Sequence, residues 1–457
     1  MSHRLFGTDG MRGKAGVEPL TPETLSRLGR VLARHIAAGE LGQAGDAQGH
    51  RVLMGHDGRE SGETLAAALT KGLNAGGVHV DILGLSPTPS LAYLTAVGPY
   101  AAGIMVSASH NPAEDNGVKL FGPNGRKLND ETEEAMEEEL KAEFTPPEAS
   151  HPGECRRTNR MLGDYVAWLR NDAFPELNLK GWKVAMDCAN GAYSKLGPRI
   201  LKAFGAEAFP VNDHPDGRNI NFECGALYPQ VAAQAAQDFG CQCGLSVDGD
   251  GDRGLLADGQ GRILDGDALL AGLGRDLAAE DRLPGRTVVA TVMSNLALEL
   301  WLQATDVRLL RVPVGDRYVA AEMREKGFHL GGEKSGHLLF GPTHGFRGDG
   351  MYTFLRVAEM LTRNEQSAEQ FAAGYQDLPQ HLENLPVARR VPMDQLPGLQ
   401  KAAAEIEAKL GNQGRVVIRF SGTELKLRLM VEAATESQVH QAIEHLRQGA
   451  DGDGILI

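Results

Sequence analysis

Apolar residues mark three stretches of the chain that follow one plan. Each stretch begins with an apolar run of strand length, at residues 51–57, 183–187 and 287–292. A segment with leucine or isoleucine at helical spacing comes next. In the first stretch it contains Leu65, Leu69 and Leu73, and Ser61 is expected to cap it. Each helical segment precedes another apolar run, at residues 78–83, 207–211 and 307–314. Strands that alternate with helices predict βαβ units, in which the strands pair in parallel.

Each stretch also contains a further strand that ends in a loop of polar residues and glycine. The three loops are residues 106–112, 247–253 and 332–337. In open α/β sheets, ligands bind outside the carboxyl ends of the strands, so three such loops can meet at one cleft. The repeated order of elements therefore predicts one site built from three similar domains.

The C-terminal part of the chain has a different pattern. It predicts a helix near residues 399–410, strands at 415–420 and 427–432, and a helix near 439–446. The expected fold class is α/β: three α/β domains with mixed, mostly parallel sheets plus a smaller α+β C-terminal domain around a central cleft. Segments rich in proline and glycine place the boundaries, and the expected domains are residues 1–155, 156–260, 261–375 and 376–457.

Composition and charge narrow the class of protein. Lys and Arg number 46 and Asp and Glu number 60 among 457 residues, and the net charge of −14 argues against a general nucleic-acid binder. No run of 18 apolar residues occurs, and residues 1–13 contain no apolar signal segment, so we expect a cytoplasmic protein without a membrane span. Five cysteines without a CxxC pair fit reduced thiols. The acidic segment 130–139 is expected to be a solvated helix face.

Ser109 is the candidate nucleophile. It lies in the loop Ser-Ala-Ser-His-Asn-Pro, which directly follows an apolar strand. A serine at such a place, with His110 and Asn111 next to it, suits a nucleophile or a phosphate carrier. A helix cap or a turn would give a serine the same local pattern. The loop is not a Gly-x-Ser-x-Gly elbow, so nothing here indicates a hydrolase triad.

Asp248, Asp250 and Asp252 alternate with two glycines. Three carboxylates at this spacing either bind a cation or repel one another strongly. The spacing resembles an EF-hand, but the sixth position is Arg253 and the twelfth is Gly259. The flanking segments are also strands rather than helices. The pattern favours Mg²⁺ over Ca²⁺, and a solvated acidic turn is the alternative.

Two further clusters could contact a substrate. One is a short glycine-containing loop with Glu333, Ser335 and His337, which resembles both a sugar-binding loop and an ordinary turn. The other is basic and combines guanidinium groups, hydroxyls and backbone N–H groups, which are typical of a phosphate site. Its members are Arg419, Ser421, Gly422, Thr423 and Arg428.

The four loops together resemble those of the α-D-phosphohexomutase superfamily. They read Ser-Ala-Ser-His-Asn-Pro, Asp-Gly-Asp-Gly-Asp-Arg, Gly-Glu-x-Ser-Gly-His and Arg-x-Ser-Gly-Thr-Glu, in this order. Residues 6–13 and 314–319 are similar to the bacterial phosphoglucosamine mutases in particular. The resemblance spans nearly the whole chain. It implies that the four domains carry, in order, a phosphoserine, a metal loop, a sugar-binding loop and a phosphate clamp.

The resemblance also implies a role for each site residue. Ser109 would be the phosphoserine, and the metal ligands would be Ser109, Asp248, Asp250 and Asp252. The phosphoryl group in transfer would be surrounded by Arg12, His110, Lys119 and Arg253, with Lys119 as a candidate general base. The sugar would contact Glu333, Ser335 and His337. The phosphate that does not react would be held by Arg419, Ser421, Gly422, Thr423 and Arg428.

The implied activity interconverts glucosamine 6-phosphate and glucosamine 1-phosphate through a phosphoserine enzyme and a 1,6-bisphosphate. One Mg²⁺ per chain and a sugar 1,6-bisphosphate primer are expected, as is a place in amino-sugar metabolism that supplies cell-wall precursors in a bacterial host. The partner would be a small amino-sugar phosphate, with neither nucleic acid nor membrane, and a homodimer is left open. Lys334 stands where Asn or Gln is common in the glucosamine enzymes. A phosphomannomutase/phosphoglucomutase therefore stays as the alternative, and a non-catalytic calcium- or sugar-phosphate-binding protein as a more remote one.

Overall fold

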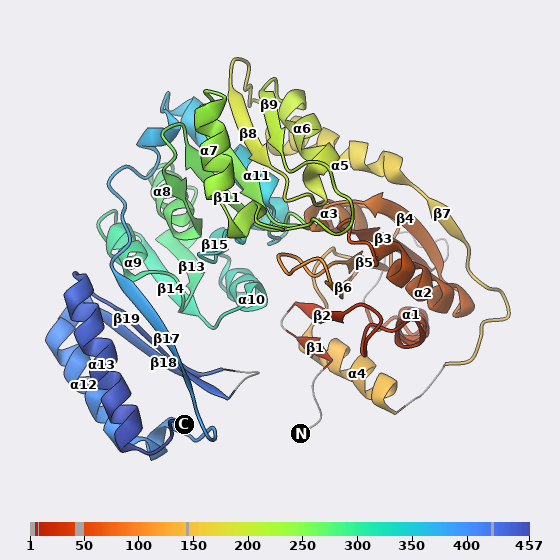
Figure 1. Ribbon diagram of the computed structural model, residues 1–457. Helices are drawn as coiled ribbons and strands as arrows, with labels where there is room; N and C mark the ends of the chain where they lie inside the picture. Colours follow the sequence, from red (N-terminus) through yellow and green to blue (C-terminus); the bar gives the residue numbers. More distant parts are fainter. Residues whose placement is uncertain (1–4, 8, 42–49, 143–145, 422–424) are drawn as a thin grey trace. The chain divides into compact units, whose positions relative to one another are not determined.

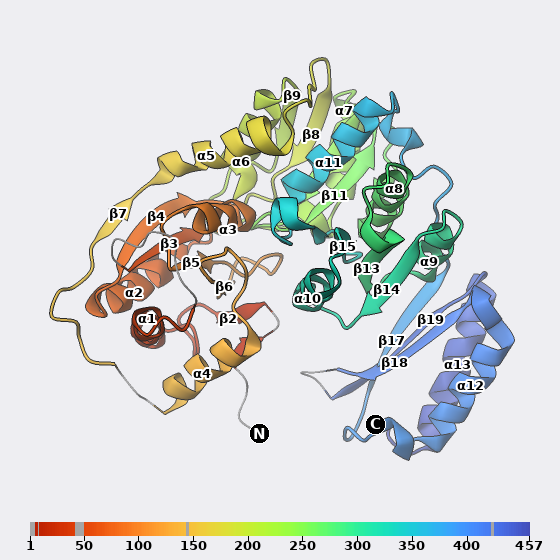
Figure 2. The ribbon, with the colours of Figure 1, turned by 180° about the vertical axis from the view of Figure 1, so that it is seen from behind.

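The computed structural model describes residues 5–7, 9–41, 50–142, 146–421 and 425–457. The chain forms two compact units. The first comprises Met1–Met293 and Leu310–Ala373, and the second comprises Ser294–Leu309 and Gly374–Ile457. Figure 1 and Figure 2 show the elements of each unit from opposite sides.

A seven-stranded mixed sheet opens the first unit. Its order is β1-β2-β6-β5-β3-β4-β7, with strands β1 (Phe6–Gly7), β2 (Gly10–Lys14), β3 (Arg51–His56), β4 (His79–Leu85), β5 (Ala102–Val106), β6 (Asp115–Phe121) and β7 (Cys155–Arg157). β3 pairs in parallel with β4 and β5, whereas β6 is antiparallel to β5 and β2. Every residue of β5 is buried, as expected for a central strand whose two faces are both covered.

The helices of this part are α1 (Pro22–Ala37), α2 (Gly62–Ala75), α3 (Thr88–Val97) and α4 (Asp130–Lys141). α2 buries Leu65, Leu69 and Leu73, which confirms the predicted apolar face. Ser61 precedes this helix, but its side chain makes no capping hydrogen bond. Its hydroxyl instead accepts a bond from Asn116 Nδ2 at 2.8 Å. The predicted side-chain cap is therefore wrong, because β6 uses the hydroxyl that would have formed it.

Helix α4 is less solvated than its charge predicted. Glu133 and Glu137 are buried, with only 2% and 5% of their surface exposed. Glu137 Oε2 accepts the backbone N–H groups of Leu5 and Phe6 at 2.8 and 3.1 Å, and Glu133 Oε2 accepts a bond from Arg317 Nη2 at 3.0 Å. The buried face of α4 thus contacts β1 and Arg317, and the half-buried Glu139 pairs with Arg34 of α1. The exposed glutamates are Glu131, Glu134 and Glu138.

Two smaller mixed sheets complete the first unit, except that Arg308 and Leu309 at the start of β14 (Arg308–Val312) belong to the second. One has the order β12-β11-β10-β8-β9 and consists of β8 (Lys183–Asp187), β9 (Glu207–Val211), β10 (Cys243–Val247), β11 (Gly254–Asp258) and β12 (Ile263–Leu264), with helices α5 (Leu162–Trp168), α6 (Tyr193–Ala203) and α7 (Gln230–Asp238). The other has the order β14-β13-β15-β16 and consists of β13 (Thr287–Thr291), β14 (Arg308–Val312), β15 (Leu330–Gly332) and β16 (Leu338–Phe340), with helices α8 (Gly266–Ala279), α10 (Asp316–Lys326) and α11 (Gly350–Arg363). The predicted mixed sheets are confirmed.

The second unit contains an antiparallel sheet covered by helices. The sheet order is β17-β19-β18, and the elements are α9 (Leu296–Gln303), β17 (Gln380–Pro386), α12 (Pro397–Leu410), β18 (Arg415–Phe420), β19 (Lys426–Glu432) and α13 (Glu436–Gly452). Leu427, Leu429 and Val431 of β19 are fully buried in one core with residues of α12 and α13. β17 lies in a segment where the sequence predicted a domain boundary. Most of its residues are only partly buried or exposed, so it lacks the apolar alternation of a typical strand.

Two further predictions concern the chain as a whole. Within the described residues, no helix has both the length and the apolarity that a membrane crossing requires. All five cysteines are free thiols.

Candidate active site

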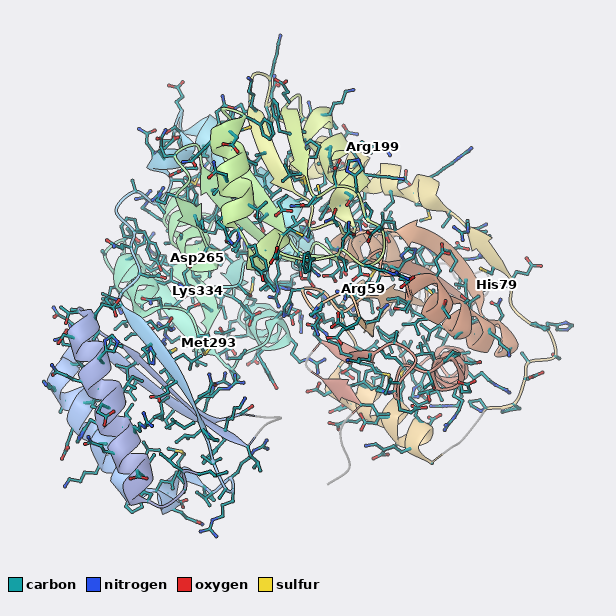
Figure 3. The ribbon with its side chains drawn as sticks, in the orientation of Figure 1. Arg59, His79, Arg199, Asp265, Met293 and Lys334 are labelled. Carbon is teal, nitrogen blue, oxygen red and sulfur yellow. The ribbon has the colours of Figure 1, made fainter. Side chains whose placement is uncertain are left out.

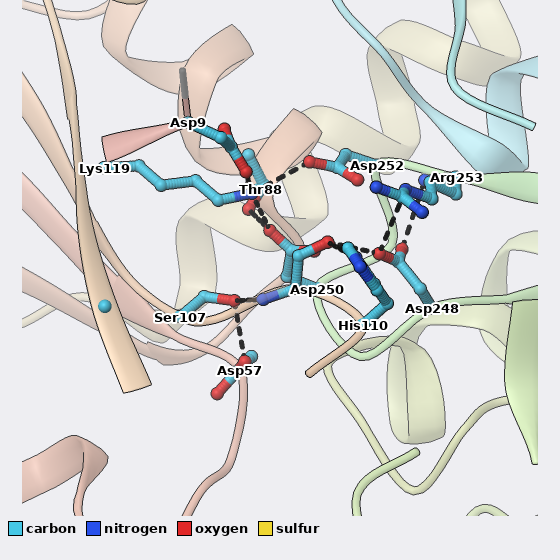
Figure 4. A network of polar contacts seen from close by, with 12 residues as sticks. Asp9, Asp57, Thr88, Ser107, His110, Lys119, Asp248, Asp250, Asp252 and Arg253 are labelled. Carbon is cyan, nitrogen blue, oxygen red and sulfur yellow. Dashed lines mark hydrogen bonds and ion pairs between the residues drawn. The ribbon is translucent and has the colours of Figure 1, made fainter. Parts of the chain in front are cut away.

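Ser109 lies in the loop that joins β5 to β6. Its backbone has a φ of +54°, in the left-handed region, which is uncommon for residues other than glycine. Ser109 Oγ donates a hydrogen bond to Asp248 Oδ2 at 2.6 Å and lies 3.4 Å from His110 Nδ1. Figure 4 shows these two partners, Asp248 and His110, within the surrounding network of polar contacts. The structure therefore brings the candidate nucleophile to the aspartate cluster, although 139 positions separate the two residues in the sequence.

Side chains from two parts of the first unit hold the Ser109 loop in this conformation. Ser107 Oγ accepts the Ser109 N–H at 2.8 Å and donates to Asp57 Oδ2 at 2.7 Å. Arg59 Nη2 donates to the carbonyls of Ser109 and Asn111, both at 2.9 Å. Asn221 Nδ2 donates to the same two carbonyls, at 2.8 and 3.1 Å. The unusual backbone of Ser109 is thus fixed from both sides.

The aspartates lie on the turn between β10 and β11. Asp248, Asp250 and Asp252 are all buried, and each offers a carboxylate oxygen within 4.8 Å of the others. Burial, together with the charges of Asp252 and Asp250, raises the pKa of Asp248 to about 7. Gly249 allows this turn to approach the serine loop, because a Cβ at that position would lie 2.8 Å from the Ser109 carbonyl oxygen.

The donor set fits a hard divalent cation. Asp250 Oδ1 is buried and has no hydrogen-bond partner among the described residues. Burying a carboxylate oxygen without a partner is costly, and a metal ion would remove that cost. Oxygen ligands without sulfur or nitrogen are those that Mg²⁺ prefers.

Lys119 of β6 meets the aspartates from the other side. Its Nζ lies 2.7 Å from Asp250 Oδ2, 2.9 Å from Asp252 Oδ2 and 3.1 Å from Asp9 Oδ2, and the side chain is 1% exposed. Burial alone would lower the pKa of Lys119, but these carboxylates raise it well above its ordinary value. An ammonium group held by three carboxylates has no lone pair to accept a proton. The geometry therefore does not favour Lys119 as the general base and supports it as a fixed positive charge.

A second group of charged side chains surrounds Asp9. Asp9 forms ion pairs with Arg12, Lys119 and Lys127. Although burial would raise it, these cations hold the pKa of Asp9 well below its usual range. Arg12 Nη1 also donates to Asn111 Oδ1 at 3.3 Å, which links this network to the serine loop.

His337 lies between Asp252 of the β10–β11 turn and Asp316 at the start of helix α10. Its Nδ1 lies 3.5 Å from Asp252 Oδ1, and its Nε2 lies 3.5 Å from Asp316 Oδ2. Burial would lower the pKa of His337, but Asp252 and Asp316 raise it to about 9. His110 has the opposite environment, because burial and the charges of Arg253 and Arg12 lower its pKa to about 3.

The predicted sugar loop is the turn between β15 and β16. Glu333 Oε1 accepts the N–H of Gly315 at 3.2 Å, and Glu333, Ser335 and the intervening Lys334 are half-buried. Lys334 Nζ lies 2.8 Å from Asp265 Oδ2 and 3.5 Å from Asp267 Oδ2, and Figure 3 shows Lys334 beside Asp265. Its charge is therefore balanced within the protein, so Lys334 adds no net positive charge to the loop.

The basic cluster lies in the second unit. Arg419 and Arg428 are direct cross-strand partners in the β18–β19 pair. Burial and the neighbouring Arg428 lower the pKa of Arg419. Arg428 Nη2 lies 3.5 Å from Ser421 Oγ, and Ser421 is buried. Two guanidinium groups on facing positions repel each other, which favours an anion between them. Gly422 and Thr423, also predicted for this cluster, lie outside the described residues.

Sequence reasoning missed several residues of the site. They are Asp9, Asp57, Arg59, Thr88, Lys127, Asn221 and Asp316, each bonded to the serine loop, to the aspartates or to the cations around them. Asp57 and Arg59 could have been found, because they directly follow β3 at the same sheet edge as the Ser109 loop. Nothing local marks Asn221.

Four family models match the chain in consecutive segments. Their descriptions are phosphoglucomutase/phosphomannomutase alpha/beta/alpha domain I over residues 3–146, domain II over 164–261, domain III over 265–378, and the C-terminal domain over 382–448. A phosphoglucosamine mutase of Anaeromyxobacter sp. is 41% identical over 453 residues, which cover 98% of this chain and 95% of the relative.

Solved structures share the fold over the full length. A phosphoglucomutase/phosphomannomutase family protein from Burkholderia thailandensis has a TM-score of 0.82 at 23% identity and covers all of both chains. The N-acetylphosphoglucosamine mutase of Aspergillus fumigatus, solved with GlcNAc-6P and magnesium, has a TM-score of 0.63 at 21% identity and covers 98% of this chain and 96% of its own. The solved structures show the shared fold, and the four family models and the 41% identical relative show that the chain belongs to the phosphoglucosamine mutase family of the phosphoglucomutase/phosphomannomutase superfamily.

Proposed function

We propose that this phosphohexomutase interconverts glucosamine 6-phosphate and glucosamine 1-phosphate through phosphorylated Ser109. The observation that carries the proposal is the buried contact of Ser109 Oγ with Asp248 Oδ2 at 2.6 Å, with Arg253 Nε 3.9 Å from the same carboxylate oxygen. A sugar 1,6-bisphosphate is the proposed intermediate and also the primer that first phosphorylates the serine. The four-domain division and the cytoplasmic location are part of the proposal, and homodimer formation stays a prediction.

Mg²⁺ is the proposed cofactor, one per chain. Asp248, Asp250 and Asp252 would hold it, together with an oxygen of the Ser109 phosphate. When bound, it neutralises charge on the phosphoryl oxygens and on the carboxylates around them. The raised pKa of Asp248 and the unpartnered Asp250 Oδ1 both support a cation at this place.

The transfer itself needs positioning and charge compensation more than covalent catalysis. The bond between phosphorus and Ser109 Oγ breaks while a bond from a sugar hydroxyl oxygen to phosphorus forms. The proton of that hydroxyl ends on Ser109 Oγ, which leaves as the free serine hydroxyl. Arg12, Lys119 and Arg253 supply the positive charge around the phosphoryl group. His110 stands next to Ser109 Oγ as a neutral imidazole that can hydrogen-bond to it.

Substrate orientation is assigned to two other clusters. Glu333, Ser335 and His337 would contact the sugar hydroxyls. The phosphate that does not react would be bound by Arg419, Ser421, Gly422, Thr423 and Arg428. After the first transfer the bisphosphate turns around, and its other phosphate returns to Ser109, so the same clamp serves both orientations.

The experiment is a coupled assay with three substrates. Glucosamine 6-phosphate, glucose 6-phosphate and mannose 6-phosphate are each supplied with Mg²⁺ and the matching 1,6-bisphosphate. The proposal expects the highest kcat/KM with the glucosamine substrate, and Lys334→Gln should leave that preference unchanged because Asp265 and Asp267 already balance the lysine. A higher kcat/KM with mannose or glucose 6-phosphate would assign the alternative phosphomannomutase/phosphoglucomutase activity.

A further inference from the structure

A pocket of about 270 Å³ lies in the first unit between residues 121–130 and helix α10. Its lining includes Asp252 and His337 of the active site, but also residues that take no part in the proposed reaction. Figure 1 and Figure 2 both show α10 facing the end of β6, where residues 121–130 begin. The pocket therefore borders the reaction site and extends beyond it.

Besides His337, which Asp252 and Asp316 face, five lysine and arginine side chains line this pocket, and they fall into two groups. Lys127 and Arg317 are neutralised: Lys127 by Asp9 and Asp316, and Arg317 by Asp130 and Glu133. The other three are Arg126, Arg324 and Arg347. Within the described part of the chain, none of these three forms an ion pair with a carboxylate. In a protein of net charge −14, three uncompensated arginines at one pocket are unexpected.

The three arginines are close enough to affect one another. The guanidinium of Arg126 lies 5.7 Å from the centre of the Phe346 ring, next in sequence to Arg347. Arg347 Nη1 donates to the Ala92 carbonyl at 3.3 Å, while its Nε is buried and has no hydrogen-bond partner in the described residues. Burial lowers the pKa of Arg347 to about 10, and partial burial of the otherwise exposed Arg324 lowers its pKa too. In both cases the charge of Arg126 adds to the effect.

We propose that Arg126, Arg324 and Arg347, here called the arginine pocket, bind the phosphate group of a small phosphate monoester. Guanidinium groups can each donate two hydrogen bonds to phosphate oxygens, and an anion would relieve their mutual repulsion. Phe346 and Tyr318 in the lining provide apolar surface for the organic part of the ester. This site is distinct from Ser109 and from the Arg419–Arg428 clamp. It makes no use of the proposed reaction, so it can be tested independently of it.

The test measures phosphate binding to the full-length, metal-free protein. Equilibrium dialysis with [³²P]phosphate and with labelled phenyl phosphate is compared for the natural protein and for Arg126→Ala/Arg324→Ala. Arg160→Ala/Arg199→Ala is the matched control, because it removes two exposed arginines that do not line the pocket. Arg126→Lys/Arg324→Lys keeps both positive charges but replaces the planar guanidinium groups, which can each donate two parallel hydrogen bonds, with ammonium groups.

We expect Arg126→Ala/Arg324→Ala to bind one phosphate fewer per chain, or to bind one at least tenfold more weakly. The control should match the natural protein, and the lysine variant should lie between them. Phenyl phosphate should bind this site more tightly than inorganic phosphate does, and that difference should vanish in the alanine variant. Identical isotherms for all variants would overturn the proposal, and equal affinities for the two probes would overturn its choice of an ester. Because Arg324 is exposed, Arg324→Ala alone gives a second folded variant with the same expected direction.

Discussion

Replacing Asn221 tests whether the backbone of Ser109 must be held for phosphoryl transfer. Asn221→Gly removes the side chain that donates to the carbonyls of Ser109 and Asn111 at 2.8 and 3.1 Å. Glycine is the informative replacement because Asn221 itself has a φ of +57°, which glycine adopts without strain. The change thus removes two hydrogen bonds and little else.

The magnitude follows from those two bonds. A hydrogen bond between buried neutral groups stabilises by about 1 kcal/mol, so the Ser109 conformation loses about 2 kcal/mol. Arg59 still holds both carbonyls, so the loop persists while its competent conformation becomes less populated. If only that conformation reacts, the rate of phosphoryl transfer to Ser109 falls roughly 30-fold.

The assay is rapid-quench phosphorylation of Ser109 by glucosamine 1,6-bisphosphate, followed by intact mass. The matched control is Glu223→Gly, since Glu223 lies in the same loop, has a φ of +51° and has an exposed side chain. The control should be phosphorylated at the natural rate. Phosphorylation of Asn221→Gly at that same rate would refute the reasoning and leave Arg59 and Asp57 as the only supports that the loop needs.

Three other changes have expected outcomes. Ser109→Ala should abolish turnover and the phosphoprotein peak in intact mass, and should lower the melting temperature because the buried Asp248 Oδ2 loses its hydrogen-bond donor; near-normal turnover would be incompatible with a phosphoserine. In EDTA, the raised pKa of Asp248, about 7, means that the folded protein binds the Asp248 proton more tightly than the unfolded chain does. This proton stabilises the fold fully below the ordinary carboxyl pKa near 4, and its stabilising effect is lost as the pH rises through 7. Asp248→Asn should therefore flatten the melting temperature between pH 4 and 8, and an unchanged pH profile would contradict the shift. Arg428→Ala should cost roughly 2–5 kcal/mol of substrate binding if its contact is well desolvated, and should lower kcat/KM equally in both directions because the equilibrium between the sugars is fixed. An unaltered KM for both substrates would make Arg428 a structural arginine.

The fold was predictable where local pattern and burial agree. The βαβ order, the buried face of α2 and strand Arg415–Phe420 all follow from apolar spacing in the sequence. β17 could not be found this way, because it is an edge strand with few buried residues, and its place is fixed by pairing with β19. The burial of Glu137 could not be predicted from the sequence for a related reason: its partners are backbone N–H groups 131 and 132 positions away.

The residues of the candidate site likewise divide into those that the sequence could predict and those that it could not. Ser109 and the three aspartates were predictable because each follows a buried strand at the carboxyl end of that strand, Ser109 after β5 in the first sheet and the aspartates after β10 in the second. Asn221 belongs to no motif, and Asp9 lies in the segment 6–13 but was given no role there. Their contacts with Ser109 and Lys119 span 112 and 110 positions of the chain. Lys119 came only from the family resemblance, and in the fold its Nζ contacts three carboxylates. Its charge state was not predictable, since it depends on these carboxylates, which only the folded chain assembles.

The most direct test of the central claim is to follow the phosphoryl group itself. Protein labelled with ³²P on Ser109 is mixed with glucosamine 6-phosphate and Mg²⁺ and quenched during a single turnover. The account predicts that the label leaves Ser109 at the catalytic rate and appears first in glucosamine 1,6-bisphosphate. Label that stays on the protein through many turnovers, or that appears only as inorganic phosphate, would contradict it.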